Sequence, residues 1–295
     1  MKDKTKGVLL AFSSSVMWGA SGVAGEFLFT EKGMTTEWLV GVRMITSGLL
    51  LLLIDYLCNK ESSIFSIFKD KNGLRGIIIF AFAGMLAVQY TYFAAIENSN
   101  AATGTVMQYM MPIIIIAWSA LSNHRMPKLY ETVCALMAIT GTVLLVTHGD
   151  LGTLAISEMA LLWGVLTAFA AAFYTVYPRW LIMRWSSTNI MGWAMFLGSL
   201  PLIIAHPPTY YIGGFEWSSF GALSYLVVFG TAIPFWAYVV STRYILPQET
   251  GIINAVEPFS SIIFSVLFLG TIFGCAELVG AMLIIIPVAY ISTRS

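Results

Sequence analysis

Apolar stretches long enough to cross a membrane, each about 20 residues, recur along the whole chain and constrain its fold more than any other feature. They lie near residues 7–29, 36–57, 74–96, 99–121, 128–147, 157–178, 187–205, 216–240, 248–268 and 275–291. Inside lipid, only helices and closed barrels satisfy all of their backbone polar groups. These stretches have helical rather than strand length, so we predict an all-α membrane protein with ten transmembrane helices.

The composition excludes several classes of protein. Of the 295 residues, 58% are hydrophobic and 10% are charged, with 15 Lys and Arg against 15 Asp and Glu. The balanced charge excludes a basic nucleic-acid-binding protein, and ten spans leave no room for a sizeable soluble domain. The three cysteines lie far apart, and no metal-ligand cluster, nucleotide motif or catalytic pair is found. We therefore expect no metal, no cofactor and no enzymatic activity.

Basic residues gather at one set of span ends. Thirteen Lys and Arg residues lie there, from Lys2 to Arg294, whereas the opposite side holds only Lys32. Positively charged loops stay on the cytoplasmic side of a membrane. This asymmetry predicts cytoplasmic termini and a multi-pass protein of the cell membrane.

The two halves of the chain are similar at an offset of about 146 residues. The matched pairs are Trp18-Gly19 with Trp163-Gly164, Gly84 with Gly230, Tyr90 with Trp236, Tyr92 with Tyr238, Pro112 with Pro258, and Glu131 with Glu277. Because each half has an odd number of spans, the second half must enter the bilayer from the opposite side. We predict two inverted five-helix repeats, 1–150 and 151–295, which meet around a site near the bilayer midplane.

Three segments carry a resemblance to a known family. They are RMITSGLLLLL from Arg43, LLWGVLTAFAAAFY at 161–174, and FGTAIPFWAYVVSTRYILPQETGIINAVEPFSSIIFSVLFLG at 229–270. In this order and spacing they resemble the EamA branch of the drug/metabolite transporter (DMT) superfamily, over essentially the whole chain. The resemblance implies two EamA repeats of five spans, a bacterial inner membrane and transport of small organic metabolites.

The ninth span carries the strongest candidate for a binding residue, Glu257. Thr250, Asn254, Glu257 and Ser261 share one helical face. Pro258 lacks a backbone donor, which frees the carbonyl about one turn earlier. Since an ionisable group at bilayer depth is costly, this polar stripe indicates a helix that lines a binding cavity. The alternative is a hydrogen-bonded packing role for Glu257.

Two further polar residues lie within spans. Gln108, on the matching face of span 4 beside Pro112, either binds a substrate or joins two helices by hydrogen bonding. Arg43, in span 2, either binds a substrate carboxylate through a bidentate contact or is neutralised by Glu26 of span 1.

Aromatic and small residues complete the candidate site. Rings around a carboxylate favour an amine or a flat aromatic group through cation–π and stacking contacts, although packing or interfacial anchoring is the alternative. The aromatic candidates are Trp18, Tyr90, Tyr92, Trp163, Tyr174, Trp236 and Tyr238. Small residues and prolines permit helices to slide or bend. The gating or hinge candidates are Gly19, Gly22, Gly164, Pro112 and Pro258.

Together these features predict a secondary transporter that works by alternating access. The expected substrate is a small amphipathic metabolite, an amino acid or related amine, and the expected direction is export. An importer or a proton-coupled exporter of quaternary ammonium or cationic drug-like compounds is the alternative, and an uncoupled uniporter fits equally well. The expected partners are the small-molecule substrate, protons if Glu257 titrates, and membrane lipids, with no nucleic acid. A monomer suffices for this function.

Overall fold

A computed structural model describes most of the chain. It covers residues 2–59, 63–122, 124, 126, 128–150, 155–209, 216–241, 244–245 and 253–294. Within these ranges every regular element is a helix and no strand occurs. Eight helices are long and apolar enough to cross a membrane, and two shorter apolar helices, Val256–Leu269 and Cys275–Tyr290, follow them.

The eight long apolar helices match the first eight expected spans within a few residues, and the two shorter ones correspond to the ninth and tenth. The first half of the chain contains α1 (Lys2–Thr30), α2 (Thr36–Cys58), η1 (Ser66–Lys69), α3 (Lys71–Ile79), η2 (Phe80–Leu86), α4 (Ala87–Glu97), α5 (Ala101–Gln108), α6 (Met111–Ser122) and α7 (Leu129–Thr147). The second half contains α8 (Glu158–Val176), α9 (Arg179–Ile182), α10 (Ser187–Ala205), α11 (Trp217–Val227), η3 (Val228–Ala232), α12 (Ile233–Ser241), α14 (Val256–Leu269) and α15 (Cys275–Arg294).

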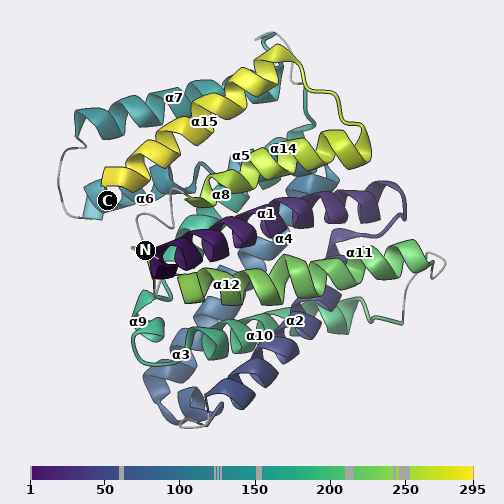
Figure 1. The fold of residues 1–295 in the computed structure, drawn as a ribbon, viewed down its shortest axis with the longest axis vertical. Helices are drawn as coiled ribbons and strands as arrows, with labels where there is room; N and C mark the ends of the chain where they lie inside the picture. The colour runs from purple at the N-terminus through teal and green to yellow at the C-terminus, as the bar shows by residue number, and fades with distance from the viewer. Residues whose placement is uncertain are drawn as a thin grey trace.

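The helices form a central group flanked by two outer pairs. In Figure 1, α7 and α15 lie at the top, and α2 and α10 lie at the bottom. Between them, α1 packs against α14 and α12, while α8 packs against α4 and α5. The chain ends N and C lie at the same side of the view.

Small residues set the closest helix contacts. Gly141 of α7 faces Gly280 of α15, and a Cβ on either glycine would lie 2.6 Å from the carbonyl oxygen of the other. In α2, a Cβ on Gly48 would lie 2.8 Å from the backbone nitrogen of Phe196 in α10. Glycine at these positions lets the two backbones of each outer pair approach directly, as is common in membrane helix pairs.

The third and eighth spans each contain a π-helical segment. η2 continues α3 into α4 and contains Gly84, and η3 joins α11 to α12 and contains Gly230. The two segments occupy matching positions in the two halves of the chain. A π segment displaces backbone groups from the regular helical ladder, and such segments are frequent at functional sites.

The fourth and ninth spans are interrupted, although the sequence predicted one continuous helix for each. α5 ends at Gln108 and α6 begins at Met111, so that Pro112 is the second residue of α6. In the ninth span a turn at Ala255 precedes α14, and Pro258 is its third residue. First-turn positions suit proline, because amides there have no partner within the helix.

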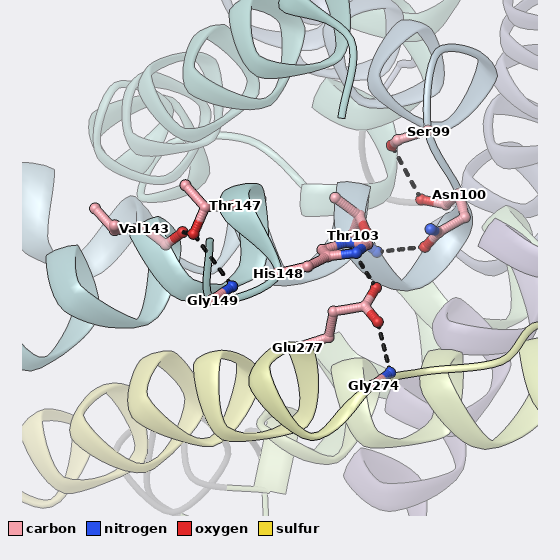
Figure 2. A network of polar contacts seen from close by, with 9 residues as sticks. All are labelled: Ser99, Asn100, Thr103, Val143, Thr147, His148, Gly149, Gly274 and Glu277. Carbon is pink, nitrogen blue, oxygen red and sulfur yellow. Dashed lines mark hydrogen bonds and ion pairs between the residues drawn. The ribbon is translucent and has the colours of Figure 1, made fainter. Parts of the chain in front are cut away.

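A polar network joins the end of α7 to the start of α15 beside α5 (Figure 2). His148 Nε2 lies 3.0 Å from Glu277 Oε1, and the backbone amide of Gly274 donates to Glu277 Oε2 at 2.6 Å. At the matching start of α7, Glu131 accepts from the amide of Lys128 at 2.8 Å. Both glutamates therefore cap their own helices.

Candidate functional site

The two helix breaks meet at Tyr109. Pro258 cannot donate to the carbonyl of Asn254, four residues earlier, and the Tyr109 hydroxyl donates to that carbonyl instead. The same hydroxyl lies 3.3 Å from Glu257 Oε2. Tyr109 comes from the break between α5 and α6. The interrupted part of the fourth span therefore supplies the hydrogen bond that the interrupted part of the ninth span lacks.

Helix α1 forms one wall of this junction. Ser15 Oγ donates to Asn254 Oδ1 at 2.9 Å. One turn further along, a Cβ on Gly19 would lie 2.6 Å from the carbonyl oxygen of Glu257 and 2.9 Å from the amide of Ser261. Only a glycine at position 19 therefore permits the first turn of α14 to rest on α1.

Aromatic side chains lie in the neighbourhood of the same carboxyl group. Trp18 packs against Phe235 and Tyr238 of α12, with ring centroids 5.2 and 5.4 Å apart. The hydroxyls of Tyr92, Tyr109 and Tyr238 all lie within electrostatic reach of Glu257. Of the residues proposed from the sequence, the structure thus brings together Trp18, Tyr92, Tyr238, Asn254 and Glu257.

A hydroxyl chain extends this group toward α4. The hydroxyls of Tyr92 and Thr105 lie 2.9 Å apart, and Thr105 Oγ1 donates to Ser261 Oγ at 3.4 Å. Ser261 belongs to the polar stripe expected on the ninth span. Thr250, the first member of that stripe, lies outside the described residues.

The other polar and aromatic candidates lie around the group without forming part of it. Gln108 donates to Thr167 at 3.2 Å and so joins α5 to α8. Tyr90 packs on Trp163 at 5.5 Å and donates to Glu37 at 2.7 Å. The remaining two are Tyr174, stacked on Phe80 at 5.7 Å, and Trp236, which is 43% exposed.

The remaining glycine candidates are positions of close packing. A Cβ on Gly22 would lie 2.6 Å from the Tyr92 hydroxyl. A Cβ on Gly164 would overlap the sulfur of Met107. Both glycines therefore hold α1 and α8 against the helices of the central group.

Arg43 does not pair with Glu26, and that expectation was wrong. The guanidinium donates to Thr231 Oγ1 at 2.9 Å, to the Gly230 carbonyl at 3.0 Å and to Gln89 at 3.0 Å, and it lies 4.8 Å from the centre of the Phe93 ring. Glu26 instead accepts from the amide of Ala101, at the start of α5. The π segment η3 supplies two of the three acceptors, and helical periodicity alone does not predict such a segment.

Two residues of the group were missed from the sequence, Tyr109 and Ser15. The face assigned to span 4 assumed an unbroken helix through Gln108, and Tyr109 points elsewhere on such a helix. The sequence feature that could have identified Tyr109 is its position three residues before Pro112. Ser15 belongs to three consecutive serines within an apolar span, one turn before Trp18.

Comparisons with known proteins agree with this architecture. The model of the EamA-like transporter family matches residues 5–147 and again residues 158–293. The uncharacterized inner membrane transporter YicL of Salmonella typhimurium is 37% identical, with 100% of this chain and 98% of the relative covered. An uncharacterized transporter of Archaeoglobus fulgidus is 24% identical, with 72% of this chain and 73% of the relative covered.

One solved crystal structure shares the fold, with a TM-score of 0.65 and 18% sequence identity. The similarity covers 98% of this chain and 99% of the other. With its apolar spanning helices and its inner-membrane relative, the chain is a multi-pass protein of the inner membrane. It belongs to the EamA-like transporter family.

Proposed function

We propose that this transporter moves a small amphipathic amine across the membrane by alternating access, in the direction of export, with Glu257 as the residue that meets the ammonium group. The observation that carries this proposal is the position of Glu257 in the first turn of α14, beside the Tyr109 hydroxyl and within reach of Tyr92 and Tyr238. Aromatic faces and a carboxylate are the groups that bind a cationic amine best.

The geometry supports exchange of the amine for a proton. Tyr109 has one hydroxyl proton, and two acceptors lie within its reach, the Asn254 carbonyl and Glu257 Oε2. An ionised Glu257 can only accept from this hydroxyl, at 3.3 Å, in competition with the Asn254 carbonyl, whereas a protonated Glu257 can also donate to the Tyr109 oxygen. We infer that the resting carboxyl holds a proton, which leaves when an ammonium group takes its place.

Alternating access is supported by the way in which the helices pair. α1 packs on α14 and α12, and α8 packs on α5 and α4, which occupy the matching positions of the other half. The outer pairs α2–α10 and α7–α15 each combine one helix from either half. If each helix is replaced by its counterpart in the other half, the same helix pairs result. This symmetry is expected for two inverted five-helix repeats, 1–150 and 151–295.

An amine fits better than a free amino acid. A zwitterionic amino acid needs a cationic partner for its carboxylate, and Arg43 is the embedded arginine of this region. Arg43 is 4% exposed, and its guanidinium already donates to three acceptors. A quaternary ammonium is the second candidate, because rings and a carboxylate suffice to bind it.

The test is flux into liposomes that contain the purified protein. Tyramine, tyrosine and N,N,N-trimethyltyramine share one ring and differ only in their charged groups. We expect protein-dependent flux of tyramine to exceed that of tyrosine, and a proton gradient to drive it. Flux of all three compounds equal to that in empty liposomes would overturn the proposal, and fast pH-independent flux of the trimethyl compound would favour the second candidate.

The variant Glu257→Gln tests whether Glu257 is the residue that binds the ammonium group. We expect it to reduce tyramine flux at least tenfold, the effect of losing about 1.4 kcal/mol or more of charge-assisted binding. Glu158→Gln is the matched control, because Glu158 is an exposed carboxylate in the first turn of α8. Equal flux in both variants would remove Glu257 from the site.

A further inference from the structure

A pocket separate from the Glu257 group opens between the third and sixth spans. Its volume is about 430 Å³. One wall is a face of α3 with Asn72, Arg75, Gly76 and Ile79, and the other is the end of α8 and α9 with Tyr177, Trp180 and Arg184. A Cβ on Gly76 would overlap the Trp180 ring, so the glycine lets the indole form the inner wall.

The lining is suited to an anionic group. It contains two guanidinium groups, one amide and one phenolic hydroxyl, and none of the seven lining residues is acidic. Arg184 lies 3.6 Å from Asp70 and 6.0 Å from the centre of the Trp180 ring. The pair with Asp70 is largely exposed and therefore weak. Arginines arranged in this way match the oxygens of a phosphate group.

The surroundings of the pocket point to a lipid rather than a free anion. Leu74, Ile78 and Phe82, four residues apart, form an exposed apolar stripe along α3, which also supplies one wall of the pocket, and η2. On the opposite wall, Val176 and Ile182 are also exposed. Acyl chains fit against such side chains, and Trp and Tyr are typical of the depth at which headgroups lie.

The same end of the molecule is basic. Lys69, Lys71 and Arg179 lie near the pocket in the chain, and Asp70 is the acidic residue among them. Basic pockets between spanning helices on the cytoplasmic side attract anionic headgroups. We propose that this pocket binds the phosphate of an anionic phospholipid headgroup.

The experiment measures lipid binding to the detergent-solubilised full-length protein by native mass spectrometry. The probes are phosphatidylglycerol, phosphatidylcholine with the same acyl chains, and sn-glycerol 3-phosphate, which has the phosphate without the chains. We expect phosphatidylglycerol to bind in preference to both. Equal binding of the two lipids would overturn the proposal, and equal saturation by glycerol phosphate would show a soluble anion site instead.

Substitutions locate the site. Arg75→Gln combined with Arg184→Gln removes both guanidinium groups, and we expect phosphatidylglycerol to bind about thirtyfold more weakly. Arg179→Gln is the matched control, since Arg179 is exposed at the same end but does not line the pocket. Melting temperatures without added lipid show whether each variant is folded. Equal losses in the double variant and the control would overturn the proposal.

The variant Asp70→Asn is expected to increase lipid binding rather than reduce it. Damage to the pocket could not produce such an increase. Asp70 caps α3 by accepting from the amide of Asn72 at 2.9 Å, and asparagine caps a helix equally well. The substitution therefore keeps the helix start and frees Arg184 from its carboxylate. We expect tighter binding of phosphatidylglycerol, and weaker or unchanged binding would contradict the assigned role of Arg184.

Discussion

At the scale of single residues, one hydroxyl group connects the two interrupted spans. Tyr109 satisfies the carbonyl that Pro258 leaves without a partner, and it also faces the Glu257 carboxyl. A buried carbonyl without a partner loses free energy because it has given up its hydrogen bonds to water. Tyr109 is therefore both a structural residue and the group that orients Glu257.

Removing this hydroxyl tests the structural role. We expect Tyr109→Phe to lower the free energy of unfolding by about 1–3 kcal/mol, because the Asn254 carbonyl loses its donor. Denaturant titration of the purified protein measures the change. Tyr56→Phe is the control, since the Tyr56 side chain is 64% exposed. Equal losses of stability in the two variants would show that the Tyr109 hydroxyl contributes nothing specific.

The sequence indicated several of these residues because their chemistry is costly in lipid. Glu257 and Asn254 were identified by polarity within an apolar span, and the structure places Asn254 and Glu257 at the junction with Tyr109. The partners of Arg43 were not predictable, since they depend on a π segment far away in the chain. Tyr109 was missed because helical periodicity does not hold across a break.

At the scale of elements, the contact between α1 and α14 positions the candidate site. The first turn of α14 lies against Gly19, at a distance that leaves no space for a side chain. The repeated Trp-Gly pair identified this position in the sequence. The contact between Gly19 and α14 could not be predicted from the sequence, because a glycine in a membrane helix does not reveal which neighbouring helix it packs against.

A single methyl group at this contact is therefore expected to be destabilising. Gly19→Ala places a Cβ within 3 Å of the backbone of α14, and we expect a loss of about 1–3 kcal/mol in unfolding free energy. Gly221→Ala is the control, because a Cβ there meets nothing within 4 Å. That control variant is expected to gain up to about 1 kcal/mol from helix propensity. A Gly19→Ala protein as stable as this control would contradict the contact.

At the scale of the whole molecule, the positions of the charges and of the chain ends support one orientation. N and C lie at the same side of Figure 1, where Arg75 belongs to α3 and Arg179 to α9, with Arg184 two residues after the end of α9. The count of basic residues in the sequence predicts that this side is cytoplasmic. The all-helical class, the limits of the first eight spans within a few residues and the family could be predicted from the sequence, because they depend on hydropathy and on motifs along the chain, whereas the breaks in the fourth and ninth spans could not.

The native cysteines test this orientation. Cys58, at the end of α2, and Cys275, at the start of α15, are exposed, and Cys134 is buried. We expect a membrane-impermeant maleimide to label Cys275 in intact cells and Cys58 only after permeabilisation. Cys58→Ser and Cys275→Ser variants assign the label to each position. Labelling of Cys58 in intact cells would reverse the orientation.

Proton release on substrate binding tests the central role of Glu257 most directly. Whichever of tyramine and N,N,N-trimethyltyramine shows the faster flux is added to solubilised protein in weakly buffered solution. The protons released per bound amine are then counted. We predict about one proton for the natural protein and none for Glu257→Gln, since an ionised carboxylate replaces the protonated one when the ammonium binds. Binding without release in the natural protein, or equal release in the Glu257→Gln variant, would contradict this role.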